Sequence, residues 1–252
     1  MNIAIITGAS SGLGKEYVKA VFESEKGLDE IWIIARRADR LEEIAKEISP
    51  KIIPLPFDIT AEDFAENFSR ILAEKKPDVK LLINNAGFGK LGLFTDISLE
   101  NNRGMVKLNC EAFTAVAYLT LPYMKENSRI INTCSIASFA PNTRMTVYSS
   151  TKAYVMSFSK GLRSELKPRK IGVLAVCPGP MDTEFLPVAD ITEGASKTFD
   201  GLPRVSPRKI AEKSLKASAK GRGVYTDRFI YKFYRFVAKI LPTDLVMKFC
   251  GA

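Results

Sequence analysis

The chain has 252 residues, of which 46% are hydrophobic and 26% charged, a composition typical of a globular protein and not of a disordered chain. Its length allows one large domain or two small ones, with a substantial core, and single α/β domains often reach about 250 residues. It contains no histidine, and its cysteines (Cys110, Cys134, Cys177 and Cys250) lack a Cys-x2-Cys spacing. These features exclude a Ser-His-Asp hydrolase and a histidine general base, and they predict neither a metal site nor a disulfide framework.

The net charge of +9 is concentrated near the C-terminus. Residues 1–203 carry 25 basic and 25 acidic side chains, whereas residues 204–252 carry 12 basic and 3 acidic ones. Two interpretations stay open: contact with phosphate or an anionic surface, and a solvated basic face. No targeting signal precedes Gly8 and no apolar run is long enough for a membrane span, so we expect the protein in the cytoplasm.

Short apolar runs rich in β-branched residues alternate with longer stretches of helical periodicity. The predicted strands are Ile3–Thr7, Ile31–Ala35, Ile52–Phe57, Leu81–Asn84, Arg129–Cys134 and Gly172–Cys177, followed by a candidate last strand at Gly223–Thr226. The predicted helices span residues 12–26, 38–48, 61–75, 98–126 and 147–167. This alternation predicts a doubly wound parallel sheet with both faces covered.

A glycine-rich segment, Thr7–Gly14, joins the first predicted strand to the first helix. Its glycines would let the backbone approach a pyrophosphate at the positive end of the helix. The spacing Gly-x3-Gly-x-Gly differs from the common Gly-x-Gly-x2-Gly, but the position between strand and helix suits a dinucleotide. The alternative is a structural turn in which Ser10 or Ser11 caps the helix.

Residues at the ends of the second and third strands bear on the choice of cofactor. Ala35 stands where an acidic residue would bind the ribose 2′-hydroxyl of NAD, and Arg36 and Arg37 follow it. Arginines attract a 2′-phosphate, which predicts NADP, although both could be solvated residues at a helix start. Asp58 would either bind the adenine or cap the helix after Ile59-Thr60.

The segment Asn84-Asn85-Ala86-Gly87 ends the fourth predicted strand, at the edge where parallel sheets bind ligands. Two adjacent asparagines can tie strands together and line the floor of a cofactor site. The alternative interpretation is a turn or helix cap.

Tyr148 and Lys152 lie one helical turn apart on the same predicted face. An ammonium near a phenol lowers the phenol pKa, which would make Tyr148 a general acid/base in a chain without histidine. Ser135, at the end of the fifth strand, would reach the same reacting oxygen. Taken alone, a pair at this spacing is also common on protein surfaces.

Six ordered motifs together resemble the classical short-chain dehydrogenase/reductase family over about residues 1–227. They are Thr7–Gly14, Asn84–Gly87, Asn109, Ser135, Tyr148-Ser149-Ser150-Thr151-Lys152 and Pro178-Gly179-Pro180-Met181-Asp182-Thr183. The resemblance implies a single Rossmann-type domain over residues 1–252 with seven strands. It also implies bound NADP(H), a small-molecule substrate, and reversible hydride transfer between the nicotinamide and a carbonyl or secondary alcohol.

The resemblance further implies a catalytic tetrad of Asn109, Ser135, Tyr148 and Lys152. Tyr148 would protonate the carbonyl oxygen and Ser135 would polarise it. Lys152 would lower the Tyr148 pKa and bind the nicotinamide ribose, while Asn109 would hold a water of a proton relay. Thr183 would bind the nicotinamide amide above a turn shaped by Pro178-Gly179. The implied cofactor-binding residues are Gly8, Ser10, Ser11, Gly12, Leu13, Gly14, Arg36, Arg37, Asp58, Ile59, Asn85, Ala86, Gly87, Tyr148, Lys152, Pro178, Gly179 and Thr183.

Two C-terminal segments are expected to form the substrate pocket. Residues 184–205 are predicted to be a substrate loop. Its apolar side chains (Phe185, Leu186, Val188, Phe199 and Leu202) favour a ketone, for example a steroid or lipid-like compound. Residues 228–252 form a basic segment with an amphipathic helix at Arg228–Leu241. The predicted basic face carries Arg228, Lys232, Arg235 and Lys239, and the opposite face carries Phe229, Ile230, Phe233, Val237 and Ile240.

Several hypotheses remain open from the sequence. The protein could be a sensor that binds NADP(H) without turnover, or a lipid or steroid reductase associated with a membrane surface. The C-terminal helix would dock on the protein body, on a second subunit or, weakly, on an anionic membrane. The long helices at 98–126 and 147–167 resemble the family's dimer surface, so a homodimer or homotetramer is expected. No nucleic-acid partner is expected.

Overall fold

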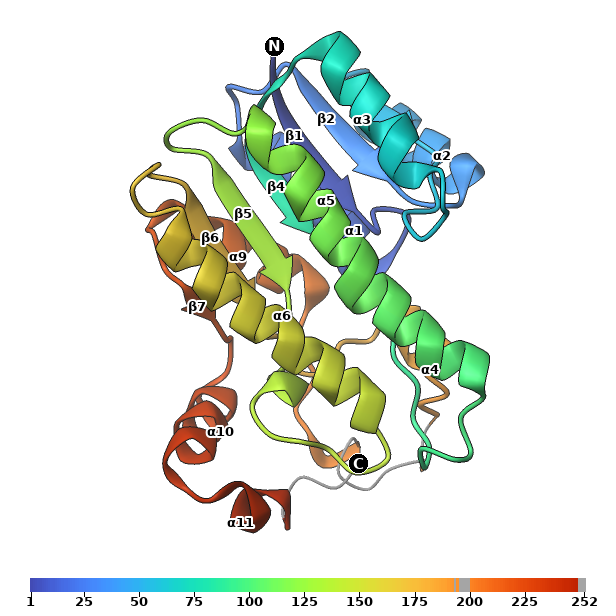
Figure 1. Cartoon of the computed structure of the whole chain (residues 1–252), viewed down its shortest axis with the longest axis vertical. Helices are drawn as coiled ribbons and strands as arrows, with labels where there is room; N and C mark the ends of the chain where they lie inside the picture. The colour runs from blue at the N-terminus through green and yellow to red at the C-terminus, as the bar shows by residue number, and fades with distance from the viewer. Residues whose placement is uncertain (193, 195–199, 249–252) are drawn as a thin grey trace.

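The fold is built on a parallel sheet, so the predicted doubly wound architecture is confirmed (Figure 1). The computed structural model describes residues 1–192, 194 and 200–248. Phe199 and Cys250, both singled out in the sequence, lie outside this described part. Within it, seven strands pair in the order β3-β2-β1-β4-β5-β6-β7, all in parallel.

The strands begin and end within a few residues of their predicted bounds. They are β1 Asn2–Thr7, β2 Glu30–Ile34, β3 Ile52–Leu55, β4 Asp78–Asn84, β5 Arg129–Thr133, β6 Gly172–Val176 and β7 Val224–Tyr225. From β1 the chain winds outward to β3 and then returns to place β4 on the other side of β1. The order therefore reverses between β1 and β4, and parallel sheets bind ligands beyond the carboxyl ends of the strands at this point.

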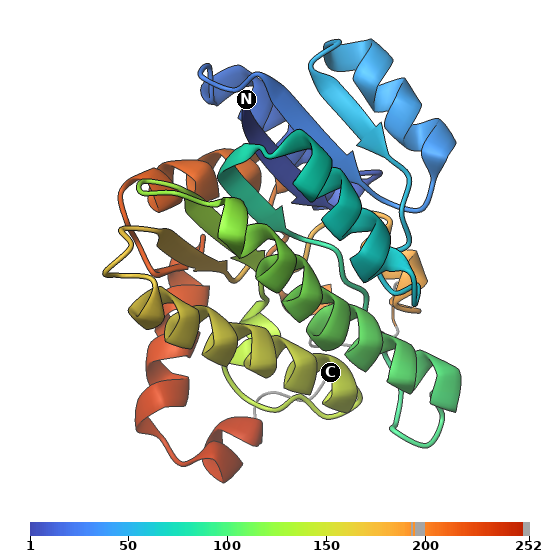
Figure 2. The same cartoon turned by 45° about the horizontal axis from the view of Figure 1, so that its top comes forward.

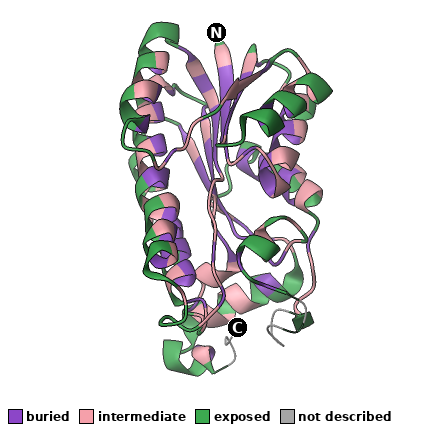
Figure 3. Ribbon diagram, turned by 90° about the vertical axis from the view of Figure 1, so that its right-hand side faces the viewer, coloured by how far each residue is buried: buried purple, intermediate pink, exposed green. Residues whose placement is uncertain are grey.

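Helices cover both faces of the sheet (Figure 3). The helices α1 Gly12–Ser24, α2 Ala38–Ile48 and α9 Pro207–Ala219 pack on one face. The helices α3 Phe64–Lys75, α5 Phe113–Thr120 and α6 Thr146–Glu165 cover the other. Alternate residues of one strand serve the two cores: Ile6 packs with α1, and Ile5 packs with α3.

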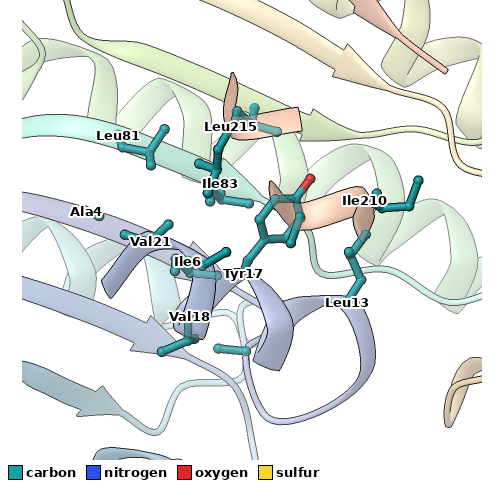
Figure 4. Close-up of a cluster of buried hydrophobic side chains, with 14 of the residues drawn as sticks. Ala4, Ile6, Leu13, Tyr17, Val18, Val21, Leu81, Ile83, Ile210 and Leu215 are labelled. Atoms are coloured by element: carbon teal, nitrogen blue, oxygen red, sulfur yellow. The ribbon is translucent and has the colours of Figure 1, made fainter. Parts of the chain in front are cut away.

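Tyr17 of α1 occupies the centre of the first core, between the sheet and α9 (Figure 4). Its ring is fully buried near Ile6, Ile83 and Ile210. Its hydroxyl shares a hydrogen bond of 2.8 Å with the Ser214 hydroxyl, and burial raises the pKa of Tyr17. This bond joins α1 to α9 across a gap of almost 200 residues in the chain.

The helix α9 is not among the predicted helices, because its buried face is made largely of small residues. Ala211, Ser214, Ala217 and Ser218 lie on that face, so the hydrophobic periodicity is weak. A capping signal was available: the Ser206 hydroxyl accepts a hydrogen bond from the Lys209 amide at 3.4 Å, and Pro207 opens the helix.

The predicted helix at 98–126 is a run of consecutive segments of different helix type. It consists of α4 Leu99–Val106, the π-helix η1 Lys107–Ala112, α5, and the 3-10 turn η2 Leu121–Tyr123. The π-helix contains Asn109, and such wide turns recur at functional sites.

The remaining elements lie at the carboxyl end of the sheet, toward which the arrowhead of β5 points in Figure 1. They are the 3-10 turn η3 Ile136–Ser138, α7 Phe185–Val188, α10 Phe229–Ile240 and α11 Thr243–Met247. The helix α10 was predicted, whereas α7 and α11 were not. None of the helices in the described residues has the length and hydrophobicity needed to cross a membrane.

Candidate active site

A cleft of about 1130 Å³ opens beyond the carboxyl ends of the strands. Single-ligand pockets measure about 300–1,000 Å³, so this cleft has room for a dinucleotide and a substrate. Its lining includes every residue that the sequence assigned to cofactor binding, together with Ser135, Tyr148 and Lys152. Asn109 is the one predicted site residue behind the wall of the cleft.

The glycine-rich turn brings bare backbone to the floor of the cleft. Gly8 and Gly12 have φ angles of +67° and +51°, in the left-handed region that favours glycine. A Cβ at Gly14 would lie 1.9 Å from the Gly8 carbonyl oxygen, and one at Gly8 would lie 2.8 Å from the Ala86 Cα. Larger residues would therefore push α1 away from the turn and from the end of β4.

An acidic side chain lies beside Arg37 at the glycine-rich turn. Ser11 is the N-cap residue of α1 but makes no side-chain capping bond, so the alternative of a turn capped by Ser11 is not what the structure shows. The Glu184 carboxylate lies 2.9 Å from the Arg37 guanidinium, and Arg37 holds the Glu184 pKa below its usual range. Arg37 can therefore bind an anionic oxygen at this point, which supports the fit of a phosphorylated cofactor.

Both predicted arginines lie at the rim of this site. Arg37 donates to the Ser10 hydroxyl at 3.0 Å, in addition to its pairing with Glu184. Arg36 is exposed and lines the cleft near Asp58. Burial works to raise the pKa of Asp58, but hydrogen bonds from Thr60 and the charge of Arg36 hold it below its usual range.

Asp58 caps a turn and lines the cleft at once. Its Oδ1 accepts hydrogen bonds from the Thr60 amide at 2.9 Å and the Thr60 hydroxyl at 2.7 Å. The helix α3 begins later, at Phe64, so the capping alternative holds for the turn rather than for the helix.

Asn84 and Asn85 tie neighbouring strands together, as one of the two interpretations expected. The Asn84 side chain accepts from the Thr7 hydroxyl of β1 at 3.4 Å and also donates to the Phe113 carbonyl of α5 at 2.7 Å. The Asn85 side chain donates to the Thr7 carbonyl at 3.2 Å and accepts from the Thr133 hydroxyl at 3.1 Å. Asn85 therefore links β1, β4 and β5 at the floor of the cleft.

Three members of the predicted tetrad meet in the cleft. Ser135 follows β5 and lies close enough to the Tyr148 hydroxyl of α6 to act on its pKa. The Lys152 ammonium lies 5.7 Å from the centroid of the Tyr148 ring and donates to the Thr133 carbonyl at 3.0 Å. All three side chains are buried, so they are held in place before any ligand arrives.

Asn109 braces this arrangement from the π-helix. Its Nδ2 donates to the Phe88 carbonyl at 2.8 Å and to the Thr151 hydroxyl at 3.0 Å, and its Oδ1 accepts from the Phe88 amide at 3.0 Å. A Cβ at Gly87 would lie 2.9 Å from that Oδ1. Both side-chain donors are thus used within the protein, which gives Asn109 a positioning role. The expected water relay stays a prediction.

The pKa of Tyr148 departs from the sequence-based expectation. Burial raises it, and this effect outweighs the hydrogen bond from Ser135. The predicted net lowering by Lys152 is therefore wrong. Burial lowers the pKa of Lys152 itself, because it disfavours the charge that would stabilise a phenolate. At neutral pH Tyr148 is consequently a protonated phenol, which is an acid rather than a base.

An apolar wall stands beside Tyr148. The Phe185 ring of α7 lies 5.6 Å from the Tyr148 ring, centroid to centroid. Four of the five predicted wall residues, Phe185, Leu186, Val188 and Leu202, line the cleft. The sequence predicted that the C-terminal segment lines the cleft, without saying which of its residues do so. The lining residues of this segment are Ile230, Tyr231, Phe233, Tyr234, Val237, Leu241 and Val246. Lys90 is a cation in this wall, and it pairs with Asp190 at 2.7 Å.

Tyr231 anchors α10 beneath the cleft, a role that the sequence did not reveal. Its ring is buried against Gly179, where a Cβ would lie 2.3 Å from the ring. Its hydroxyl donates to the Pro203 carbonyl at 2.7 Å. The turn after β6 and the C-terminal helix are therefore packed as one unit.

Comparison with known proteins agrees with this geometry. Residues 2–193 match the family model described as short chain dehydrogenase. The chain belongs to the short-chain dehydrogenase family. A probable NADP-dependent dehydrogenase of Haemophilus influenzae is 37% identical over 215 residues, covering 82% of this chain and 84% of that protein. Serine 3-dehydrogenase of Agrobacterium fabrum is 33% identical over 204 residues, covering 79% and 78%. The crystal structure of a short-chain dehydrogenase from Burkholderia cenocepacia in complex with NADP superposes with a TM-score of 0.81 at 25% identity, covering 98% and 96%.

Proposed function

We propose that this short-chain dehydrogenase is an NADP(H)-dependent enzyme that reduces an apolar ketone to a secondary alcohol. The observation that carries the proposal is the convergence of Ser135, Tyr148 and Lys152 on one wall of a cleft whose floor is the glycine-rich turn. The relatives named as NADP-dependent support the cofactor. One domain over residues 1–252 accommodates all of these parts.

The side chains have distinct parts in the reaction. NADPH supplies the hydride when bound. Tyr148 donates its proton to the carbonyl oxygen, since burial keeps the phenol protonated. Ser135 donates a hydrogen bond to the same oxygen and holds it near Tyr148. Lys152, 5.7 Å from the Tyr148 ring, binds the nicotinamide ribose and stabilises the phenolate that remains.

Arg36 and Arg37 select the phosphorylated cofactor. Arg37 already pairs with a carboxylate, so this corner is suited to an anion. The Thr183 side chain packs against Gly12, where a Cβ would lie 3.3 Å from the Thr183 Cβ. This contact places the start of the substrate loop beside the glycine-rich turn. We infer that Thr183 would bind the nicotinamide amide of the cofactor.

Glu184 competes with the cofactor phosphate for Arg37, so we expect Glu184→Gln to tighten NADPH binding. Exposed ion pairs are worth about 0.2–1 kcal/mol, which predicts an NADPH Kd lower by roughly 1.4-fold to fivefold. NADH lacks the 2′-phosphate and should bind with an unchanged Kd. Fluorescence titration of both cofactors tests this, and weaker NADPH binding by the variant would show that Glu184 supports the cofactor instead.

The raised Tyr148 pKa predicts opposite pH profiles for the two directions of the reaction. Reduction needs the phenol and should stay level from about pH 6 to 9, whereas oxidation needs the phenolate and should rise about tenfold per pH unit over that range. Measuring kcat/KM in both directions tests this. A reduction rate that falls above about pH 7 would instead indicate a phenol pKa lowered by Lys152.

The substrate is proposed from the apolar wall around Tyr148. Leu91, Met105, Met145 and Ile191 form the buried cluster behind it, and Lys90 is already paired with Asp190. A ketone with a hydrophobic body, such as a steroid or a fatty-chain compound, fits this wall better than a small acid does.

Oxidation of NADPH against a panel of aliphatic, aromatic, steroid and sugar ketones tests the proposal. The reverse reaction with serine and a 3-hydroxy acid should accompany it. We expect the highest kcat/KM for hydrophobic ketones. A preference for serine would indicate that the substrate carboxylate binds the Lys90 ammonium. Tight NADPH binding with no turnover of any compound would favour a sensor.

The outer surfaces of α4, α5 and α6 suit a homodimer, as the family resemblance implied. Val106, Tyr118 and Tyr154 are exposed there, and Tyr118 is 76% exposed. Aromatic residues at the centre of a flat helical surface are typical of subunit interfaces. Sedimentation analysis of the chain and of its Tyr118→Glu variant tests this assembly.

A further inference from the structure

The outward face of α10 carries large apolar side chains that the rest of the described chain does not cover. Phe229, Phe233, Phe236 and Ile240 recur at helical spacing and are 81, 56, 60 and 62% exposed. The described residues therefore do not bury these four side chains against the body of the protein. We call this row the apolar row.

A row of basic residues runs alongside the apolar row. Arg228, Lys232, Arg235 and Lys239 have the same spacing, displaced by one residue. The basic residues were predicted on the face opposite the apolar ones, whereas the two rows lie side by side on the helix surface. Between residues 228 and 248 there are five Lys and Arg and one acidic residue, Asp244. The surface thus combines exposed aromatic rings with a strong positive charge.

The inward face of α10 holds the helix rigidly. Tyr231 is buried against Gly179, and the Tyr234 ring lies 5.6 Å from the Phe139 ring. Val246 of α11 packs with Ala140, and Tyr234 packs against that pair. The helix α10, which carries both rows, is thus packed against the protein and lies in the lower part of the molecule in Figure 1.

We propose that this face of α10 docks on an anionic lipid surface. The phenylalanines would enter the headgroup region while the exposed Lys232 and Lys239 contact lipid phosphates, as in interfacial amphipathic helices. Arg228 is turned to the protein, where its guanidinium donates to the Arg204 carbonyl, and Arg235 is half-buried. A second copy of the chain is a poorer occupant, because an antiparallel two-fold contact between the apolar rows would put both basic rows on the same side of the interface. Since no described helix can cross a membrane, the attachment is peripheral.

The cleft opens beside this face. Phe233 belongs to the apolar row and also lines the cleft, as do Ile230 and Val237 of the same helix. A docked α10 would therefore place the mouth of the cleft at the lipid surface, where a hydrophobic compound could enter without crossing water.

Co-sedimentation of the full chain with vesicles tests the docking. We expect binding to vesicles that contain phosphatidylglycerol and phosphatidylcholine, little binding to phosphatidylcholine alone, and weaker binding as salt is raised. Each basic residue near an anionic leaflet strengthens binding by about fivefold. Lys232→Glu with Lys239→Glu should therefore reduce vesicle affinity by at least about 25-fold.

Two further variants separate lipid contact from overall charge. Phe229→Ser with Phe236→Ser keeps the charge and should lower vesicle affinity by at least about tenfold. Lys216→Glu with Lys220→Glu, at exposed positions in and just after α9, changes the net charge as the α10 pair does and should have a much smaller effect. Phe94→Ser is the aromatic control, in the loop between β4 and α4, where the ring is 61% exposed.

Three outcomes would overturn the proposal. The first is no binding to anionic vesicles at low salt. The second is equal loss of binding in the α9 and α10 charge variants, which would indicate attraction by net charge alone. The third is an assembly that dissociates when Phe229 and Phe236 are replaced, while the intact chain ignores vesicles. That result would make the face a subunit interface.

Discussion

Replacing Tyr148 by Phe should lower kcat for ketone reduction by at least about 100-fold, the general acid/base scale, while the Kd for NADPH stays nearly unchanged. The variant loses only the hydroxyl, whose partner is Ser135, and keeps the ring packed against Phe185. The chain contains no histidine that could donate the proton instead. Steady-state kinetics together with NADPH titration measure the two effects separately.

Tyr154→Phe is the matched control, because it removes the same atom from the same helix. The Tyr154 hydroxyl lies on the outer side of α6, 2.7 Å from the Thr114 hydroxyl, so the control should retain wild-type kinetics. Thermal unfolding of both variants checks that neither fold is disturbed. A Tyr148→Phe enzyme that reduces ketones at the wild-type rate would end the assignment of the proton donor.

Arg36→Ala should weaken NADPH binding by roughly tenfold to 150-fold, which corresponds to about 1.5–3 kcal/mol for a hydrogen bond to a charged group. Arg36 is the better probe of the two arginines. Arg37 is also bonded to Ser10 and Glu184, so its removal would disturb the turn as well as the ligand. Isothermal titration with NADPH and NADH gives the affinities.

NADH affinity should be the same in wild type and in Arg36→Ala, because NADH has no 2′-phosphate for the arginine to bind. Arg70→Ala, at an exposed position on α3, serves as the control for loss of one positive charge. Equal affinity of the wild-type chain for NADPH and NADH would show that the arginines do not select the cofactor.

The sheet could be predicted because each buried strand is a nearly continuous apolar run, as in β1 and β4. Hydrophobic periodicity did not predict α9, because small residues such as Ser214 and Ala217 lie on its buried face. Small residues pack as well as large ones when two elements approach closely, and they leave little trace in a hydrophobicity pattern.

The position of the predicted residues at one cleft could be anticipated from the sequence, but their electrostatics could not. Residue order was sufficient to place Ser135 and Tyr148 in one cleft, since strand ends and helix faces follow from the motifs. The direction of the Tyr148 pKa depends on how deeply the phenol and Lys152 are buried, which local spacing does not report. For the same reason, the pairing of Glu184 with Arg37 appeared only in three dimensions.

Hydride transfer to the substrate carbon is the central claim, and isotope transfer tests it most directly. The purified chain is given NADPH carrying deuterium at the transferable position of C4, together with the best ketone of the panel, and the alcohol is analysed by mass spectrometry. The account predicts an alcohol about one mass unit heavier, with the label on the carbinol carbon, and almost none of it from Tyr148→Phe. An unlabelled alcohol, or no alcohol from any ketone while NADPH binds tightly, would contradict it.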